Sequence, residues 1–263
     1  MPIEPGRVLL VGAGPGAADL MTVRAARAVE SAQALLYDAL VDDEILAMAP
    51  VACVRIQTGK RAGKASMGQE AINRLMLRLA RRGLRVVRLK GGDPSVFGRS
   101  GEERAFLEAH GIDVEIIPGV TAASAAAAQF AFPLTHRGQA RRVSFVTARV
   151  ESGAVTDTGW EALADAQTTA VFYMARDSAG AVVDRMIAQG RSALTPALAV
   201  ENAGRRNARA VAAPLKLLAQ AVEAALFEGP VLLVVGEAAA QARDAEVFMP
   251  EPAALAAYLR SGS

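Results

Sequence analysis

The sequence predicts an α/β fold built as two successive α/β domains. Short runs rich in Val, Leu and Ile alternate with alanine-rich helical stretches along the chain, which is typical of helices packed on a mostly parallel sheet. The 263 residues are 52% apolar and 21% charged, which excludes a disordered protein and allows a large core. A basic turn at 138–142 separates two such series. We therefore expect domains at 1–138 and 143–245 and a tail at 246–263.

The first series alternates short apolar runs with stretches of helical periodicity. The runs predict strands at 8–11, 34–37, 54–57, 85–90 and 114–117. The periodic stretches predict helices at 23–31, 68–82 and 101–110. Ligands of open α/β sheets bind beyond the carboxyl ends of the strands, so a site is expected in the loops that follow them.

The second series repeats this pattern. It predicts strands at 143–148, 170–174, 197–200, 208–212 and 231–236. Its helices are expected at 179–189 and at 214–227, where Pro214 opens the helix in the first turn, a position that tolerates proline. The tail after Val247 has the pattern of one more short helix and is assigned no function.

Composition limits the classes of partner. A single cysteine, Cys53, excludes a disulfide scaffold and fits a reducing compartment. No apolar run reaches the ~20 residues of a membrane span, and the N-terminus lacks a signal pattern. The net charge is only +2, with one Trp and three Tyr, which disfavours nucleic-acid binding. We expect a cytoplasmic protein without membrane or nucleic-acid partners.

The loop after the first strand is rich in glycine. Gly12-Ala13-Gly14-Pro15-Gly16-Ala17 satisfies the fingerprint of dinucleotide sites, in which a pyrophosphate rests on the helix that follows. Here Pro15 stiffens the loop, and residues 19–22 precede the helix, for which Thr22 is the expected N-cap. The fingerprint therefore leaves a dinucleotide site and a purely structural turn both open.

Two further loops after strands carry charge. Asp38 follows the second strand and suits two roles equally, capping the next helix or acting as a catalytic base. Residues 58–64 place Lys60, Arg61 and Lys64 among glycines. Such clusters usually face solvent, but these cations could also converge on an anion, and arginine binds carboxylates through two hydrogen bonds.

The most distinctive segment is 87–103. A buried strand breaks at two glycines, 91–92, then Asp93 follows and Arg99 stands beside a glycine. The two acids at 102–103 complement the dipole of the helix that begins there. Glycines of this kind let the backbone approach a ligand closely.

Segments 117–124 and 133–137 complete the candidate site. The first ends a strand and opens a helix of small residues, which suits either a flat ligand ring or close helix–sheet packing. The second ends in His136-Arg137. A lone histidine is more often structural than catalytic, yet His136 beside Arg137 near the predicted domain junction suits an anionic substrate.

The chain resembles the tetrapyrrole methylase family over nearly its whole length. The resemblance is carried, in order, by residues 11–16, 37–41, 59–61, 88–94, 97–99, 102–103, 133–137 and 172–174. It implies two α/β domains with S-adenosylmethionine in the cleft between them. It also implies methyl transfer to two ring carbons of uroporphyrinogen III, giving precorrin-2 by way of precorrin-1, a step shared by sirohaem, cobalamin and haem d1 synthesis. A homodimer is implied, and the reaction needs no metal.

Residue roles follow from the same resemblance. Asp38 would be the proton acceptor and Lys60 the proton donor. The substrate's carboxylates would meet Arg61, Arg99, His136 and Arg137. Cofactor contacts would come from Pro15, Gly91, Gly92, Asp93, Val96, Thr121, Ala122, Met174 and Ala203. Ala203 departs from the family pattern, which has a glycine there. Alternatives are a relative acting on a later corrin intermediate or another acceptor, a nicotinamide or flavin oxidoreductase, and a tetrapyrrole carrier.

Overall fold

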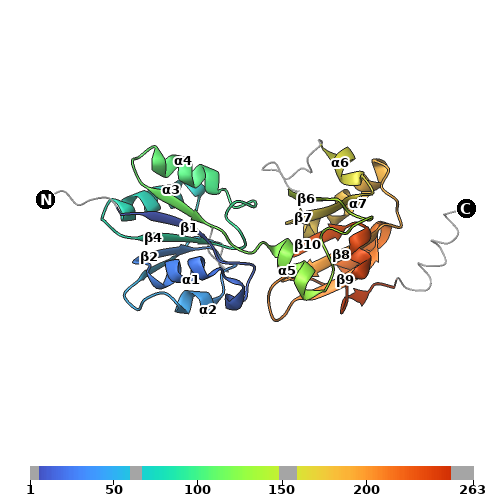
Figure 1. Cartoon of the computed structure of the whole chain (residues 1–263), viewed down its shortest axis with the longest axis horizontal. Coiled ribbons are helices and arrows are strands. Elements are labelled where there is room, and N and C mark those ends of the chain that lie inside the picture. The colour runs from blue at the N-terminus through green and yellow to red at the C-terminus, as the bar shows by residue number, and fades with distance from the viewer. Residues whose placement is uncertain (1–5, 60–66, 148–158, 250–263) are drawn as a thin grey trace, which may run out of the picture. The chain divides into compact units, whose positions relative to one another are not determined.

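The chain folds into two compact units (Figure 1). The computed structural model describes residues 6–59, 67–147 and 159–249. Unit 1 comprises Met1–Ala125 and Gly204–Arg206; unit 2 comprises Ala126–Ala203 and Asn207–Ser263. The division falls within helix α5 (Ala122–Gln129), earlier in the chain than the turn at 138–142.

Unit 1 contains a five-stranded parallel sheet in the order β3-β2-β4-β1-β5. Along the chain its strands are β1 (Val8–Gly12), β2 (Ala34–Tyr37), β3 (Val54–Gln57), β4 (Val86–Lys90) and β5 (Val114–Ile117). Because every pairing is parallel, all the carboxyl ends lie at one edge of the sheet. The central strand is β4, and Leu36 of β2 and Leu10 of β1 are both in register with its Arg88.

Helices cover both faces of this sheet (Figure 1). One face packs on α1 (Val23–Glu30) and α2 (Asp43–Ala47), and the other on α3 (Gln69–Ala80) and α4 (Ser100–Glu108). Successive β4 residues alternate between the faces, so Val87 belongs to the first core and Val86 to the second. Arg88 and Lys90 are in phase with Val86 and therefore lie on the face covered by α3 and α4.

Unit 2 contains a six-stranded sheet in the order β11-β9-β8-β10-β7-β6. Its strands are β6 (Arg142–Thr147), β7 (Thr168–Tyr173), β8 (Pro196–Glu201), β9 (Arg209–Pro214), β10 (Val231–Val235) and β11 (Glu246–Val247). The expectation of a mostly parallel sheet is wrong here, since β8 runs antiparallel to β9 and β10, and β10 antiparallel to β7. Residues 202–208 alone link β8 to β9, which is too short for a parallel crossover of about a dozen residues.

The helices of unit 2 pack around a core that includes Phe172, Met186 and Leu218. The helices that contribute to this core are α6 (Trp160–Ala164), α7 (Ala179–Ala188) and α8 (Leu218–Ala224). Short 3-10 turns are η1 (Ala18–Leu20) in unit 1 and η2 (Arg176–Ser178), η3 (Leu215–Leu217) and η4 (Glu237–Gln241) in unit 2. Within the described ranges, no helix is long and apolar enough to cross a membrane.

Most predicted elements of both series are present with bounds within a few residues. Strands β2, β3 and β5 have the predicted bounds. The predicted N-cap of α1 is also confirmed, because the Thr22 hydroxyl accepts a hydrogen bond from the Ala25 N–H at 3.1 Å. Helix α6 and strand β11 were not predicted, and α2 was expected only as a helix after Asp38, without bounds, because all three are too short to show a period.

Glu201 ties two loops of unit 2 together at the end of β8. Its side chain is buried, and one carboxylate oxygen accepts from the Glu228 and Gly229 N–H groups, both at 2.6 Å, while Arg209 contacts the other. Burial by itself raises the pKa of Glu201, but the hydrogen bonds from Gly229, Arg209 and Glu228 together hold that pKa below its ordinary value. The stabilisation is therefore present at neutral pH and is lost as the pH falls through the folded-state pKa.

We expect Glu201→Gln to destabilise the protein by about 2 kcal/mol at pH 7, because an amide cannot accept from all of these donors as a carboxylate does. Thermal unfolding as a function of pH measures the effect. The difference from the parent should shrink under acidic conditions, where Glu201 is protonated. The exposed Glu223→Gln is the matched control and should change little. A pH-independent difference would contradict the assigned charge effect.

Candidate active site

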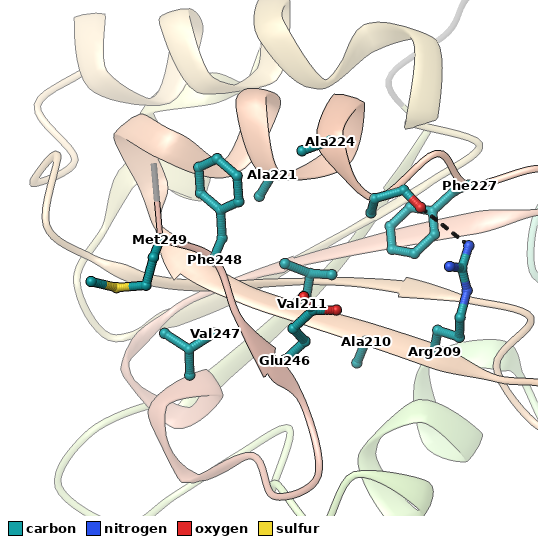
Figure 2. Close-up of a pocket in the computed structure, with 11 residues that line it drawn as sticks. Arg209, Ala210, Val211, Ala221, Ala224, Phe227, Glu246, Val247, Phe248 and Met249 are labelled. Carbon is teal, nitrogen blue, oxygen red and sulfur yellow. Dashed lines mark hydrogen bonds between the residues drawn. The ribbon is translucent and has the colours of Figure 1, made fainter. Parts of the chain in front are cut away.

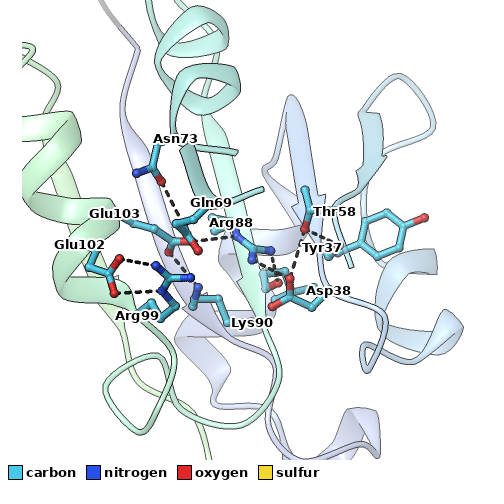
Figure 3. A network of polar contacts seen from close by, with 11 residues as sticks. Tyr37, Asp38, Thr58, Gln69, Asn73, Arg88, Lys90, Arg99, Glu102 and Glu103 are labelled. Atoms are coloured by element: carbon cyan, nitrogen blue, oxygen red, sulfur yellow. Dashed lines mark hydrogen bonds and ion pairs between the residues drawn. The ribbon is translucent and has the colours of Figure 1, made fainter. Parts of the chain in front are cut away.

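Two charged side chains lie buried on strand β4. Arg88 and Lys90 are only 3% and 4% exposed, because their strand is the central one of the sheet. A buried charge costs free energy unless it is paired and hydrogen-bonded. Their carboxylate partners are Glu103 of α4 and Asp38, which lies just beyond the end of the neighbouring strand β2 (Figure 3).

Glu103, in the first turn of α4, contacts both of these cations and is completely buried. Its Oε1 lies 3.3 Å from Arg88 Nε and its Oε2 lies 2.9 Å from Lys90 Nζ. Gln69 of α3 donates to the same Oε1 at 3.1 Å. Burial, and then the Arg88 guanidinium, lower the pKa of Lys90 below its ordinary value, against the opposing pull of Glu103.

Asp38 joins this cluster from the carboxyl edge of the sheet, one residue beyond β2. Its Oδ1 accepts from Arg88 Nη2 at 2.6 Å and from the Thr58 hydroxyl at 3.2 Å. The Asp38 side chain is 33% exposed, so the carboxylate is both anchored and accessible. The residue that caps α2 is Asp42, which accepts from the Glu44 N–H. The capping interpretation of Asp38 is therefore wrong.

Arg99 stands at the N-cap of α4 with a positive φ of 56°. Its Nε and Nη2 donate to the two carboxylate oxygens of Glu102 at 2.9 and 2.6 Å, and the Arg99 side chain remains half-exposed. The hydrogen bond from Arg99 lowers the pKa of Glu102. This two-pronged contact with Glu102 fixes the position of the Arg99 guanidinium at the end of the 91–98 loop.

The backbones of Gly12, Gly92 and Gly119 pack against one another where β1, β4 and β5 end. A Cβ on Gly12 would lie 2.6 Å from Gly119 Cα and 2.7 Å from the Gly92 carbonyl oxygen, which leaves no room for a side chain. The Gly92 N–H donates to the Gly14 carbonyl at 2.7 Å, and the Gly14 N–H donates back at 3.2 Å. Asp93 locks the same edge, because its Oδ2 accepts from the Gly119 N–H at 2.9 Å and its Oδ1 from the Ser95 N–H at 2.7 Å.

Residues 204–206 complete this edge in unit 1. Gly204 has a φ of 80°, and a Cβ there would lie 2.3 Å from Cγ of Pro15. The Ala17 N–H donates to the Gly204 carbonyl at 2.9 Å, and Arg205 Nη2 donates to the Leu40 carbonyl. The glycine-rich loop thus packs on the connection between β8 and β9. It does not lead directly into an α-helix, because the 3-10 turn η1 precedes α1.

The structure brings some of the predicted site residues together. Unit 1 places Asp38, Arg99, Pro15 and the 91–96 loop at the carboxyl edge of one sheet, with Thr121 and Ala122 after β5. The predicted residues Met174, Ala203, His136 and Arg137 belong to unit 2. Met174 is 60% exposed with a positive φ, whereas Ala203 is buried. The His136 ring nitrogen contacts the Arg137 carbonyl at 2.9 Å. Lys60 and Arg61 lie outside the described residues.

Five residues of the polar cluster were not predicted as site residues: Thr58, Gln69, Arg88, Lys90 and Glu103. Arg88 and Lys90 were visible as two charges, two residues apart, in a run that otherwise reads as a buried strand. That pattern places both charges on one face of the strand and demands a buried partner. Glu103, predicted only to complement the helix dipole, is that partner.

A hollow of about 480 Å³ lies in unit 2 between α8 and β9 (Figure 2). Its lining includes Phe227, Val211 and Phe248, and Arg209 donates across one end to the Ala225 carbonyl at 3.3 Å. None of the predicted site residues that the structure describes lines this hollow. The polar cluster of unit 1 therefore remains the candidate active site.

The fold and the polar cluster are those of an α/β enzyme, and comparison with known proteins gives its class. The family model for tetrapyrrole (corrin/porphyrin) methylases matches residues 7–219. The chain therefore belongs to the tetrapyrrole methylase family and is a methyltransferase. The oxidoreductase interpretation of the glycine-rich loop is thereby overturned.

Two individual relatives resemble this chain over most of its length. A siroheme synthase from Xylella fastidiosa is 44% identical over 249 residues, covering 95% of this chain and 52% of the relative. The chain thus spans about half the length of that relative. The native form of uroporphyrin III C-methyl transferase from Thermus thermophilus is 39% identical, with a TM-score of 0.75 and coverage of 89% of this chain and 93% of that one. The Thermus enzyme has also been solved with S-adenosylhomocysteine.

A third relative has a different acceptor in its name. A cobalt precorrin-4 methyltransferase of cobalamin biosynthesis is 28% identical with a TM-score of 0.80, covering 89% of this chain and 95% of that one.

Proposed function

We propose that this chain transfers methyl groups from S-adenosylmethionine to two ring carbons of uroporphyrinogen III, giving precorrin-2 by way of precorrin-1. The observation that carries the proposal is Asp38, a partly exposed carboxylate anchored by Arg88 at the same carboxyl edge of the sheet as the close-packed glycine backbones. The likeness to the Thermus enzyme supports the choice of acceptor.

The glycine edge fits an extended ligand such as S-adenosylmethionine. A Cβ on Gly92 would meet no atom within 4 Å, and one on Gly91 would meet only Leu40 Cβ, at 3.6 Å. A ligand can therefore approach this backbone directly. We assign the cofactor contacts to Pro15, Gly91, Gly92, Asp93, Val96, Thr121, Ala122, Met174 and Ala203. When bound, S-adenosylmethionine supplies a methyl group activated by its sulfonium.

The chain's own residues have two tasks. The first is to hold the carboxylate-rich ring in place, which we assign to Arg61, Arg99, His136 and Arg137, because guanidinium groups bind carboxylates through paired hydrogen bonds. The second is proton transfer. Asp38 accepts the one proton that the ring loses for each methyl group it gains. We assign Lys60 as proton donor, and any proton that it gives to the ring is matched by a further proton that the ring loses.

Incubation of the chain with uroporphyrinogen III and S-adenosylmethionine under reducing conditions tests the proposal. Mass analysis should show two added methyl groups. No gain in mass, beside an active control enzyme, would end it.

A second candidate is methylation of a later corrin intermediate, which the likeness to the precorrin-4 enzyme favours. A panel of tetrapyrrole acceptors separates the two candidates. Turnover of the later intermediates without turnover of uroporphyrinogen III would establish the second candidate.

Arg99→Lys should raise the KM for uroporphyrinogen III about tenfold and leave kcat within about threefold. Lysine keeps the charge but cannot form the paired hydrogen bonds of a guanidinium with a substrate carboxylate. Steady-state kinetics measures both constants. The control is Arg104→Lys on the same helix, whose side chain is exposed and pairs with Glu108. A variant that loses kcat at saturating substrate would contradict a binding role for Arg99.

We also propose that the enzyme is a cytoplasmic homodimer. Light scattering at assay concentration should give twice the chain mass. A mass of one chain would contradict the dimer.

A further inference from the structure

Glu103 is a buried charge to which the proposed chemistry gives no role. It is completely buried, it belongs to neither set of proposed contacts, and a buried carboxylate is costly to maintain. Well-packed apolar residues often replace such ion pairs without loss of stability, so stability alone is a weak explanation for it.

The side chains connect Glu103 to Asp38 through one guanidinium. Arg88 Nε lies 3.3 Å from Glu103 Oε1, and Arg88 Nη2 lies 2.6 Å from Asp38 Oδ1 (Figure 3). The Arg88 side chain is 4% exposed and so has little freedom of its own. The third nitrogen, Nη1, donates to the Leu89 carbonyl at 3.3 Å, so the three contacts together fix both the position and the rotation of this planar group.

The other partners of Glu103 hold its carboxylate in place. Lys90 Nζ donates to Glu103 Oε2 at 2.9 Å, and Gln69 donates to Oε1 at 3.1 Å. Gln69 is in turn positioned by α3, where it also donates to Asn73. Two buried cations thus face two carboxylates, and only the Asp38 carboxylate is partly exposed.

We infer that Glu103 is a positioning residue that sets the catalytic carboxylate of Asp38 by holding Arg88. The inference rests on the proposed function, in which Asp38 accepts a proton. Glu103 itself touches neither substrate nor cofactor. Because Glu103 acts through the Arg88 guanidinium, its replacement should change kcat and leave substrate binding unchanged.

The test compares Glu103→Gln with Glu108→Gln, an exposed glutamate on the same helix that pairs with Arg104. We expect Glu103→Gln to lower kcat about tenfold, below the ~100-fold that misplacing a catalytic group can cause, with the KM for uroporphyrinogen III and the affinity for S-adenosylhomocysteine within about twofold of the parent. Glu108→Gln should match the parent. Parental kcat in a folded Glu103→Gln variant would overturn the inference.

A double-mutant cycle asks whether the effect passes through Arg88. In an Arg88→Met background, Glu103→Gln should lower kcat no further, because the connecting group is already missing. Additive losses in the cycle would overturn the inference. Should Glu103→Gln fail to fold, Arg88→Lys replaces it, since an ammonium keeps the charge but cannot bridge both carboxylates. It should also lose about tenfold in kcat, and parental turnover would overturn the inference.

A crystal structure of Glu103→Gln separates this inference from the proposed function. The parent's turnover of uroporphyrinogen III tests the function, whereas the contact between Arg88 Nη2 and Asp38 Oδ1 tests the positioning. We expect that contact, 2.6 Å in the parent, to be broken in the variant. An unchanged contact would overturn the positioning role whatever the substrate proves to be.

Discussion

Replacement of Asp38 by asparagine should lower kcat at least ~100-fold, the low end of what general-base catalysis contributes, and leave the affinity for S-adenosylhomocysteine unchanged. An amide keeps the size of the side chain and can still accept from Arg88 and the Thr58 hydroxyl, so the local structure should persist. It cannot take a proton from the methylated ring. Single-turnover assays and calorimetry measure the two quantities separately.

The matched control is Asp43→Asn, which removes the same charge from an exposed position in the first turn of α2. It should turn over at the parental rate. The competing assignment makes Arg99 the base. That assignment requires an arginine with a pKa far below its usual range, and it predicts near-parental turnover in Asp38→Asn and an inactive Arg99→Lys at saturating substrate.

The second large effect is expected from Gly12→Ala. Its new Cβ would lie within 2.7 Å of backbone atoms of both Gly92 and Gly119, and backbone cannot move aside as a flexible side chain can. We expect a loss of about 3 kcal/mol, the upper end for overpacking, with a fall of about 6–12 °C in the thermal midpoint. Binding of S-adenosylhomocysteine should weaken in parallel, because the same backbones form the proposed cofactor edge.

Gly101→Ala is the control for this substitution. Gly101 lies in α4, and a Cβ there meets nothing within 4 Å. Alanine is the better helix former, so the control should gain about 0.5–1 kcal/mol. Gly12→Ala with a parental midpoint would show that the packing of the glycine backbones is looser than these distances require.

Hydrophobic pattern predicted most of the fold because the pattern is local. Strands β1, β2 and β4 of unit 1 are largely buried runs rich in Val and Leu, and helix α3 shows a period over its whole length. The direction of β9 relative to β8 depends on the short 202–208 connection between them, and hydrophobic periodicity carries no information on strand direction. The antiparallel β8–β9 pair was therefore missed, although the strands themselves were predicted.

The candidate site was predictable only in part, for a related reason. Asp38 and Arg99 lie in loops after strands, where function is expected. Arg88 and Glu103 lie within secondary structure and meet only through the packing of α4 on β4. Their contact depends on tertiary packing, which the sequence pattern does not report. The charges of Arg88 and Lys90 in the apolar strand β4 did indicate that a buried partner had to exist.

The segment Gly204–Arg206 has a consequence for dissecting the protein into fragments. Neither unit is a continuous stretch of chain, because these residues complete unit 1 from within the sequence of unit 2. A fragment ending at Ala125 would strip Pro15 of its packing partner Gly204 and leave the Ala17 N–H and the Leu40 carbonyl without their acceptor and donor. Cleavage or insertion at 204–206 should therefore be felt at the glycine edge, far away in the sequence, and fragment complementation should require that this short segment be supplied.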